Sequence, residues 1–179
     1  MSNGEPVPEA PSRSIALVGL SGTGKSTIAP LLASRLGYGD SVDLDRLIEQ
    51  RFGRSVDEIF AEDGEAAFRR AEADALAEAL TGPPVVIATG GGIVLQQDNR
   101  ELLRSRATVV WLRASPSHLA ERLADTTEAR PLLAGDAQFA LDRLASEREA
   151  LYAEVADLTV DVEGLDIASV LAEVIRGVG

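Results

Sequence analysis

A glycine-rich stretch near the start of the chain carries residue types that bind phosphate. Residues 19–27 read GLSGTGKST and match the phosphate-loop pattern G-x-x-x-x-G-K-[ST]. Glycines let backbone N–H groups turn toward phosphate oxygens, and the N-terminus of the helix that follows adds positive charge. Lys25 can reach the β- and γ-phosphates, and the Ser26 hydroxyl can bind Mg²⁺. The pattern predicts a nucleoside triphosphate site formed by Ser21, Gly22, Thr23, Gly24, Lys25, Ser26 and Thr27.

The segments on either side of this loop supply the elements that it requires. Residues 14–18 (SIALV) form an apolar run typical of a buried strand. After the loop, apolar residues recur at helical spacing until Gly37 ends the pattern; they are Ile28, Leu31, Leu32 and Leu36. A glycine-rich connection that binds nothing is the alternative, and the order of strand, loop and helix disfavours it.

Apolar runs alternate with amphipathic stretches through the rest of the chain. The expected strands are 14–18, a short one ending at 43–45, 85–88, 108–112 and 158–162. The expected helices are about 28–36, 47–52, 56–62, 65–80, 99–104, 116–123, 139–155 and 167–175. Because the strands are nearly all apolar, this alternation predicts a five-stranded parallel sheet with helices on both faces, an α/β fold.

The chain divides into a tail, one domain and a long loop within that domain. Residues 1–13 are rich in Pro, Glu, Ser and Gly and lack the pattern of a signal peptide, so we expect a disordered tail. Residues 14–179 have the length of one domain. Residues 122–136 include a stretch without apolar periodicity, and we expect a mobile lid there.

The composition excludes several classes of function. Acidic residues outnumber basic ones, 29 to 17, and the net charge of −12 argues against nucleic-acid or anionic-membrane partners, which need basic surfaces. No apolar run approaches the roughly 20 residues that span a bilayer. The absence of cysteine excludes disulfides, thiolate metal sites and a cysteine nucleophile. We expect a cytoplasmic monomer that holds an anionic substrate with a local group of arginines.

Four features are expected to meet at one edge of the predicted sheet, because ligands of such sheets bind at the carboxyl ends of the strands. They are the phosphate loop, Asp43 with Asp45, the glycines at 90–92, and the segment after Leu112. Each feature has a simpler alternative. Either aspartate could cap the next helix, the glycines could form only a tight turn, and a single arginine is usually a solvated surface residue.

The ordered combination of motifs resembles the shikimate kinase family, small relatives of the nucleoside monophosphate kinases. The motifs are GLSGTGKST at 19–27, DLD at 43–45, FRR at 68–70, GGG at 90–92, RPLL at 130–133, and Arg148 followed by Leu151-Tyr152. The likeness covers about residues 14–176. It implies a P-loop kinase fold and transfer of the γ-phosphoryl group of MgATP to the 3-hydroxyl of shikimate, in aromatic amino-acid biosynthesis.

The resemblance also implies roles for the residues around the transferred phosphoryl group. Lys25, Asp45 and Arg130 would be catalytic. Asp45 would accept hydrogen bonds from the ring hydroxyls and help to deprotonate the attacking one, while Arg130 in the lid would close over the phosphoryl group. Ser26 and Asp43 would bind Mg²⁺, Asp43 through its water shell.

The resemblance further implies how the substrate is held. Arg69 and Arg148 match a pair of arginines that grips the substrate carboxylate, because a guanidinium makes two parallel hydrogen bonds with it. Glu72 follows Arg69 by one helical turn and could orient it. Gly91 and Gly92 would present backbone amides to the substrate, since glycine lets the main chain approach closely.

The nucleoside side of the site is less defined. Arg122 is expected to stack on adenine and, with Arg130, to belong to the nucleotide site; Arg113 is the alternative for stacking. The only histidine, His118, is expected to be non-catalytic on a surface helix. Trp111, within an expected strand, is assigned to the core.

Two departures from the family pattern and two rival functions stand beside this interpretation. Ala150 occupies a position where the family usually has proline, which predicts a looser Arg148, and residues 122–130 are one residue longer than in common members. A sibling kinase acting on gluconate or a nucleoside monophosphate is the nearest rival. A non-catalytic nucleotide-binding module is the other, although the chain lacks the N-K-x-D motif of regulatory GTPases and a strand ending in an Asp-Glu pair.

Overall fold

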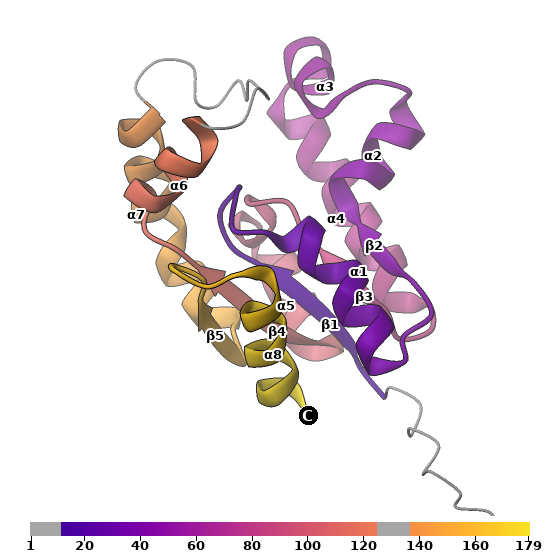
Figure 1. The fold of residues 1–179 in the computed structure, drawn as a ribbon. Coiled ribbons are helices and arrows are strands. Elements are labelled where there is room, and N and C mark those ends of the chain that lie inside the picture. The colour runs from indigo at the N-terminus through magenta and orange to yellow at the C-terminus, as the bar shows by residue number, and fades with distance from the viewer. Residues whose placement is uncertain (1–11, 125–136) are drawn as a thin grey trace, which may run out of the picture.

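Five parallel strands form one sheet in the part of the chain that the computed structural model describes, residues 12–124 and 137–179 (Figure 1). The strands are β1 (Ser14–Val18), β2 (Ser41–Asp43), β3 (Val86–Ala88), β4 (Ala107–Arg113) and β5 (Leu158–Asp161). Their spatial order is β2-β3-β1-β4-β5, so the strand that leads into the phosphate loop lies at the centre. The α/β fold with a five-stranded parallel sheet is therefore confirmed.

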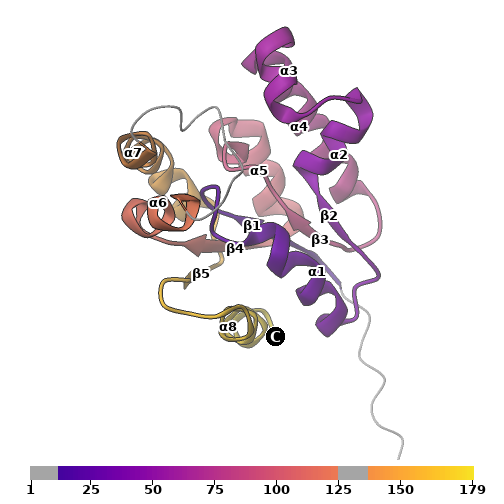
Figure 2. The ribbon, with the colours of Figure 1, turned by 45° about the horizontal axis from the view of Figure 1, so that its top comes forward.

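Helices cover both faces of this sheet. They are α1 (Lys25–Leu36), α2 (Leu44–Phe52), α3 (Val56–Asp63), α4 (Glu65–Thr81), the 3-10 turn η1 (Ile93–Leu95), α5 (Gln97–Arg106), α6 (Pro116–Ala124), α7 (Ala137–Val155) and α8 (Ile167–Val178). Figure 2 shows α1 and α8 on one face, with α5 and α7 on the other. Helices α2, α3 and α4 pack together beyond the β2 edge (Figures 1 and 2). None of the helices in the described ranges combines the length and apolar composition needed to cross a bilayer.

The central strands are buried because both of their faces are covered. All five residues of β1 and all three of β3 are buried, as their continuous apolar character predicts. The three parallel partners of β3 in β1 are Ile15 to Val86, Ala16 to Ile87, and Leu17 to Ala88. This register brings the phosphate loop after β1 and the glycine run after β3 to the same carboxyl edge of the sheet.

The chain turns from β2 into α2 earlier than the sequence suggested. We expected Asp43-Leu44-Asp45 to end a strand, but β2 ends at Asp43 and α2 begins at Leu44. Asp43 has extended backbone angles and its Oδ1 accepts a hydrogen bond from the amide of Arg46 at 3.3 Å, so it is the N-cap of α2. Asp45 lies in the first turn, where the helix dipole favours a negative charge.

Other helix boundaries follow their local sequence signals. Ser55 and Glu58 form the expected capping box at the start of α3, and Asp166 caps α8 through the amide of Ser169. Helix α5 is longer than expected at both ends, since its polar first and last turns have no apolar residues to mark them. Residues 1–11 and 125–136 are outside the described ranges, so the expected tail lies largely outside them and the expected lid almost wholly so.

Gly19 fixes the phosphate loop against the end of β4. Its φ is +137°, a conformation that residues with side chains rarely adopt. A Cβ atom at this position would lie 2.4 Å from the carbonyl oxygen of Leu112, a backbone atom that cannot rotate away. Close contact between loop and strand therefore requires glycine for two separate reasons.

We expect Gly19→Ala to lower the free energy of unfolding by about 2–4 kcal/mol, because it adds backbone strain to a collision with main chain. Urea denaturation would measure the loss. Gly39→Ala is the matched control, since a Cβ there meets nothing within 4 Å and the backbone is not left-handed. Equal stability of the two variants would contradict the proposed contact.

Candidate active site

The phosphate loop presents an open helix N-terminus and a buried ammonium group. Gly24, the N-cap of α1, is left-handed (φ 98°, ψ 12°) and no side chain caps the helix. Lys25 is only 7% exposed, and its Nζ donates to the carbonyls of Gly19 at 2.7 Å and Leu20 at 2.8 Å. The first turn thus offers amide donors and a lysine charge on one short segment, which is the arrangement that binds phosphate.

Two clefts flank this loop. The first has a volume of about 620 Å³ and is lined on the loop side by Ser21 and Ser26. The second has a volume of about 580 Å³ and receives Thr23, Gly24 and Thr27. Most of the loop residues expected to hold phosphate therefore line one cleft or the other, while Gly22 and Lys25 line neither.

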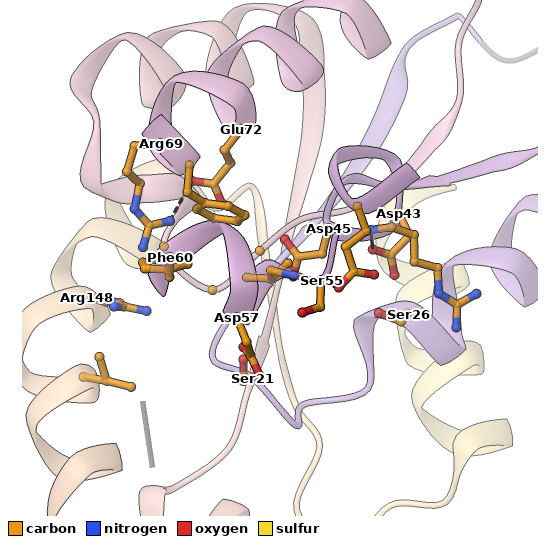
Figure 3. Close-up of a pocket in the computed structure, with 18 of the residues that line it drawn as sticks. Ser21, Ser26, Asp43, Asp45, Ser55, Asp57, Phe60, Arg69, Glu72 and Arg148 are labelled. Atoms are coloured by element: carbon orange, nitrogen blue, oxygen red, sulfur yellow. Dashed lines mark hydrogen bonds and ion pairs between the residues drawn. The ribbon is translucent and has the colours of Figure 1, made fainter. Parts of the chain in front are cut away.

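The first cleft gathers most of the residues that the motifs singled out. Figure 3 labels residues of this cleft that come from the phosphate loop, β2, α2, α4 and α7, together with residues at the start of and within α3. The predicted residues that line it are Ser21, Ser26, Asp43, Asp45, Arg69, Gly91, Gly92 and Arg148. Side chains separated by up to about two thirds of the chain thus meet at the carboxyl edge of the sheet, as the parallel topology requires.

Arg69 is held in place by carboxylates of its own helix. Its Nη1 donates to Glu72 Oε2 at 2.7 Å, so the expected orientation by Glu72 is present, and Nε and Nη2 each lie 3.3 Å from Glu65 Oε1. The guanidinium also lies 5.3 Å from the ring centre of Phe68 and 5.8 Å from that of Phe60. The contacts with Glu65 and Phe60 were not anticipated, although the spacing of Glu65 and Arg69 is the signal of a helical ion pair.

Arg148 reaches the same cleft from α7. It is 7% exposed, and its Nε is buried without a hydrogen-bond partner among the described residues. A buried, charged donor without a partner is costly unless a ligand satisfies it. Helix α7 runs unbroken from Ala137 to Val155, so alanine in place of the family's usual proline leaves Ala150 within continuous helix.

The three glycines after β3 give space to the charged side chains. A Cβ on Gly90 would lie 2.6 Å from Glu72 Oε1 and 2.9 Å from Asp45 Oδ1. A Cβ on Gly92 would lie 2.3 Å from Arg69 Nη1, and on Gly91 it would lie 3.5 Å from Arg148 Nη1. None of these glycines has a positive φ. Residues 90–93 also form a turn, closed by the hydrogen bond from the Ile93 amide to the Gly90 carbonyl at 3.2 Å, so the tight-turn alternative is correct in part. The turn alone does not account for the close approach of side chains at Gly90 and Gly92, whereas the contact at Gly91 is an ordinary one.

The charges in this cleft influence one another. Glu72 is fully buried, and burial raises the pKa of its carboxyl, while the charge of Arg69 opposes that rise. Asp45 adds to the increase in the pKa of Glu72, and Arg148 reduces it. Two carboxylates and two guanidiniums thus form one coupled cluster (Figure 3).

The expected metal ligands fit a magnesium ion. Ser26 and Asp43 both line the first cleft beside the phosphate loop. Mg²⁺ binds through one or two protein oxygens together with waters and phosphates, and a hydroxyl and a carboxylate supply such oxygens. The Asp43 carboxylate also caps α2, so the capping alternative weighed for this residue is correct without excluding the second contact.

Arg122, the residue expected to stack on the adenine base, lies at the second cleft. Arg122 on α6 is exposed and lines it, with His118 one turn earlier. Leu165, from the segment between β5 and α8, and Ile167, at the start of α8, line it too. Arg113 instead pairs with Asp161 at 2.6 Å on the neighbouring strand. Arg130 lies outside the described residues.

Trp111 belongs to the core, as expected, and its neighbour there was not anticipated. The indole is 7% exposed, and its ring centre lies 5.7 Å from that of Tyr152. Tyr152 is fully buried, and its hydroxyl donates a hydrogen bond to the carbonyl of Gly91. The aromatic pair of Trp111 and Tyr152 therefore connects β4 with the glycine run of the active site.

Comparison with known proteins agrees with this geometry. Residues 21–178 match the family model described as shikimate kinase. A shikimate kinase of Symbiobacterium thermophilum is 44% identical over 164 residues, which cover 90% of this chain and 94% of that protein. The structure of shikimate kinase from Acinetobacter baumannii in complex with shikimate has a TM-score of 0.87 and 33% identity, covering 93% of this chain and 92% of that one.

A more distant likeness concerns the fold alone. A gluconokinase from Sinorhizobium meliloti superposes with a TM-score of 0.60 at 23% identity, covering 92% of this chain and 90% of that one. The family model spans nearly all of the described residues, and the relatives of higher identity carry its name. The chain belongs to the shikimate kinase family.

Proposed function

We infer that this chain transfers the γ-phosphoryl group of ATP to the 3-hydroxyl of shikimate, giving shikimate 3-phosphate and ADP. The observation that carries this conclusion is the meeting of Arg69 and Arg148 with Asp45 in a cleft that the phosphate loop also lines. A ring acid with several hydroxyls needs one cationic grip for its carboxylate and an acceptor for its hydroxyls. The first cleft supplies both beside the phosphates.

The two clefts suggest how the substrates are arranged. The nucleoside would occupy the second cleft, with Arg122 beside the base, and its phosphates would follow the loop toward the first cleft. Lys25 and the amides at the start of α1 would hold the β- and γ-phosphates. The γ-phosphorus would then face the space that Ser21, Ser26 and Asp45 line.

The chemistry asks mainly for alignment and charge stabilisation. Phosphoryl transfer passes through a loose transition state, so little help is needed from a base. Asp45 would orient the 3-hydroxyl and accept its proton as the new bond forms. Arg130 is assigned to the transferred phosphoryl group by its motif alone. Mg²⁺, which we assign to Ser26 and Asp43, would neutralise charge on the phosphates when bound.

Arg69 and Arg148, which we call the carboxylate clamp, would hold the substrate carboxylate over Gly91 and Gly92. Arg148 brings a buried donor that has no partner in residues 12–124 and 137–179, and Arg69 brings a guanidinium already oriented by Glu65 and Glu72. A guanidinium held in this way loses little entropy when a carboxylate binds. The flanking rings of Phe60 and Phe68 exclude water from one side of the clamp.

The substrate is tested by comparing acceptors in a coupled assay of ADP release. Shikimate should support turnover at least about 100-fold better in kcat/KM than gluconate or AMP, since AMP lacks a carboxylate and gluconate lacks the ring. Lys25→Met is the inactive control for phosphate binding. Strong turnover with gluconate or AMP alone would assign the chain to a sibling kinase, and ATP binding without turnover would favour a non-catalytic module.

We expect Arg148→Lys to raise the KM for shikimate roughly 10- to 100-fold while the KM for ATP changes little, because lysine cannot form the paired hydrogen bonds. Steady-state kinetics with each substrate varied would measure the difference. Arg143→Lys is the matched control, since Arg143 is exposed on the same helix and lies 3.8 Å from Glu147. Equal weakening for both substrates would count against the clamp.

We expect Gly92→Ala to raise the KM for shikimate about tenfold with a stability change within about 1 kcal/mol. The φ of −98° accepts alanine, but the new Cβ occupies the space of the Arg69 guanidinium, which must move away. Gly82→Ala, where a Cβ meets nothing within 4 Å, is the control. An unchanged KM in Gly92→Ala would mean that the position of Arg69 does not matter for binding.

A further inference from the structure

Tyr152 connects the glycine run of the active site with helix α7 and with the aromatic core. Tyr152 lies one helical turn after Arg148 on α7, so both side chains leave the same face of the helix. Its hydroxyl donates a hydrogen bond to the carbonyl of Gly91. Its ring packs against Trp111 of β4 at 5.7 Å between ring centres.

Gly91 is the point at which both residues of α7 meet the glycine run. Its carbonyl accepts from Tyr152, and its α-carbon faces Arg148 Nη1, which would lie 3.5 Å from a Cβ there. The next residue, Gly92, faces Arg69 from α4. The two guanidiniums of the clamp therefore rest on neighbouring residues of one loop, and the separation between them depends on where that loop lies relative to α7.

The same hydroxyl also interacts with Arg148 directly. Burial raises the pKa of Tyr152 above its usual value, while the charge of Arg148 and its hydrogen bond to the hydroxyl oppose that rise. Tyr152 therefore remains protonated and keeps its donor hydrogen on Gly91 throughout the neutral range. A hydroxyl can accept from one partner while donating to another, so it can link the guanidinium to the loop.

A second hydrogen-bonded connection joins this segment to α7 among the described residues. Arg100 of α5 donates to the carbonyl of Val94 at 2.8 Å and lies 3.3 Å from Glu154 of α7, which ties η1 to the end of the helix. That connection reaches the far side of η1 and does not touch Gly91 or Gly92. Among the described residues, the hydrogen bond from the Tyr152 hydroxyl is therefore the side-chain hydrogen bond that reaches the glycine run itself, at the Gly91 carbonyl.

We propose that Tyr152 is a positioning residue for shikimate, whose hydroxyl sets the distance between Arg148 and the glycine run and thereby the spacing of the carboxylate clamp. The proposal deepens the proposed function and rests on it. Tyr152 does not touch the reacting atoms; it acts through Gly91 and Arg148. Loss of its hydroxyl should weaken the grip on the carboxylate and leave the nucleotide side unaffected.

The test compares Tyr152→Phe with Tyr38→Phe. Phenylalanine keeps the ring against Trp111 and removes only the hydroxyl, so the fold should survive. Tyr38 is the other tyrosine of the chain, and its hydroxyl donates at 2.7 Å to the carbonyl of Arg13, away from both clefts. The KM for shikimate should rise about 3- to 10-fold in Tyr152→Phe and change less than about twofold in Tyr38→Phe, with the KM for ATP unchanged in both.

Two further measurements separate positioning from general loosening. Amide exchange of residues 90–95 should be about 3- to 10-fold faster in Tyr152→Phe without any substrate, because the loop loses its anchor. Trp111→Phe disturbs the packing but keeps the hydroxyl, so it should lower thermal stability without moving the KM for shikimate. Unchanged exchange in residues 90–95, or equal KM values for shikimate in the two tyrosine variants, would overturn the proposal.

Failure of the proposed function gives a different result. It would appear in the unaltered chain, as ATP turnover that shikimate does not stimulate. The amide-exchange measurement needs no substrate, so it tests whether Tyr152 anchors residues 90–95 whether or not the chain phosphorylates shikimate. A rise in the KM for ATP equal to that for shikimate would also overturn the proposal, because a carboxylate clamp does not contact the nucleotide.

Discussion

Two guanidinium groups lie in one largely buried cleft, and their mutual repulsion is the constraint that the surrounding structure must offset. Arg69 and Arg148 are 9% and 7% exposed, so water screens them poorly. Glu65 and Glu72 pair with Arg69, and Asp45 lies against the same glycine run as Glu72. The carboxylates make the cationic pair tolerable in the folded chain and also hold it in a defined orientation.

This balance of charge has consequences for selectivity. A cleft with two guanidiniums and nearby carboxylates can accept one more negative charge at modest cost. A phosphate monoester placed against the two guanidiniums would bring nearly two charges close to Glu65 and Glu72, which pair with Arg69, and like charges repel at that range. The arrangement therefore suits a carboxylic acid better than a nucleotide. The cationic group is local, since the chain as a whole carries a charge of −12.

The sheet supplies the rigidity that this balance needs. Strand β1 lies at the centre and is fully buried, so the phosphate loop begins from a strand that is paired on both sides. The parallel register of β1 and β3 then fixes where the glycine run lies relative to that loop. Glycine stands where the main chain of each segment has its closest contact. Side chains from α2, α4 and α7 can therefore approach the main chain of the glycine run without displacing it.

Local patterns in the sequence determined most of the architecture. The apolar runs, the phosphate-loop pattern and the capping signals at Ser55 and Asp166 act within a few residues, so they can be interpreted without a structure. The same patterns indicated that the phosphate loop, Asp43 with Asp45 and the glycines at 90–92 would gather at one sheet edge, whereas Arg69 and Arg148 were assigned to the site by the family resemblance. The patterns misjudged the turn at Asp43, where a side-chain cap starts α2 directly after β2, because capping and strand pairing compete for the same few residues.

Only the tertiary structure decided what the glycine run is for. The sequence GGG is compatible with a turn, with flexibility or with close approach, and the three differ only in what lies nearby. The side chains nearest to Gly90, Gly91 and Gly92 come from α2, α4 and α7, which are separate segments of the chain. The contact of Tyr152 with Gly91 joins residues 61 positions apart in the same way. Such contacts depend on how whole helices pack, and no local pattern of residues encodes that packing.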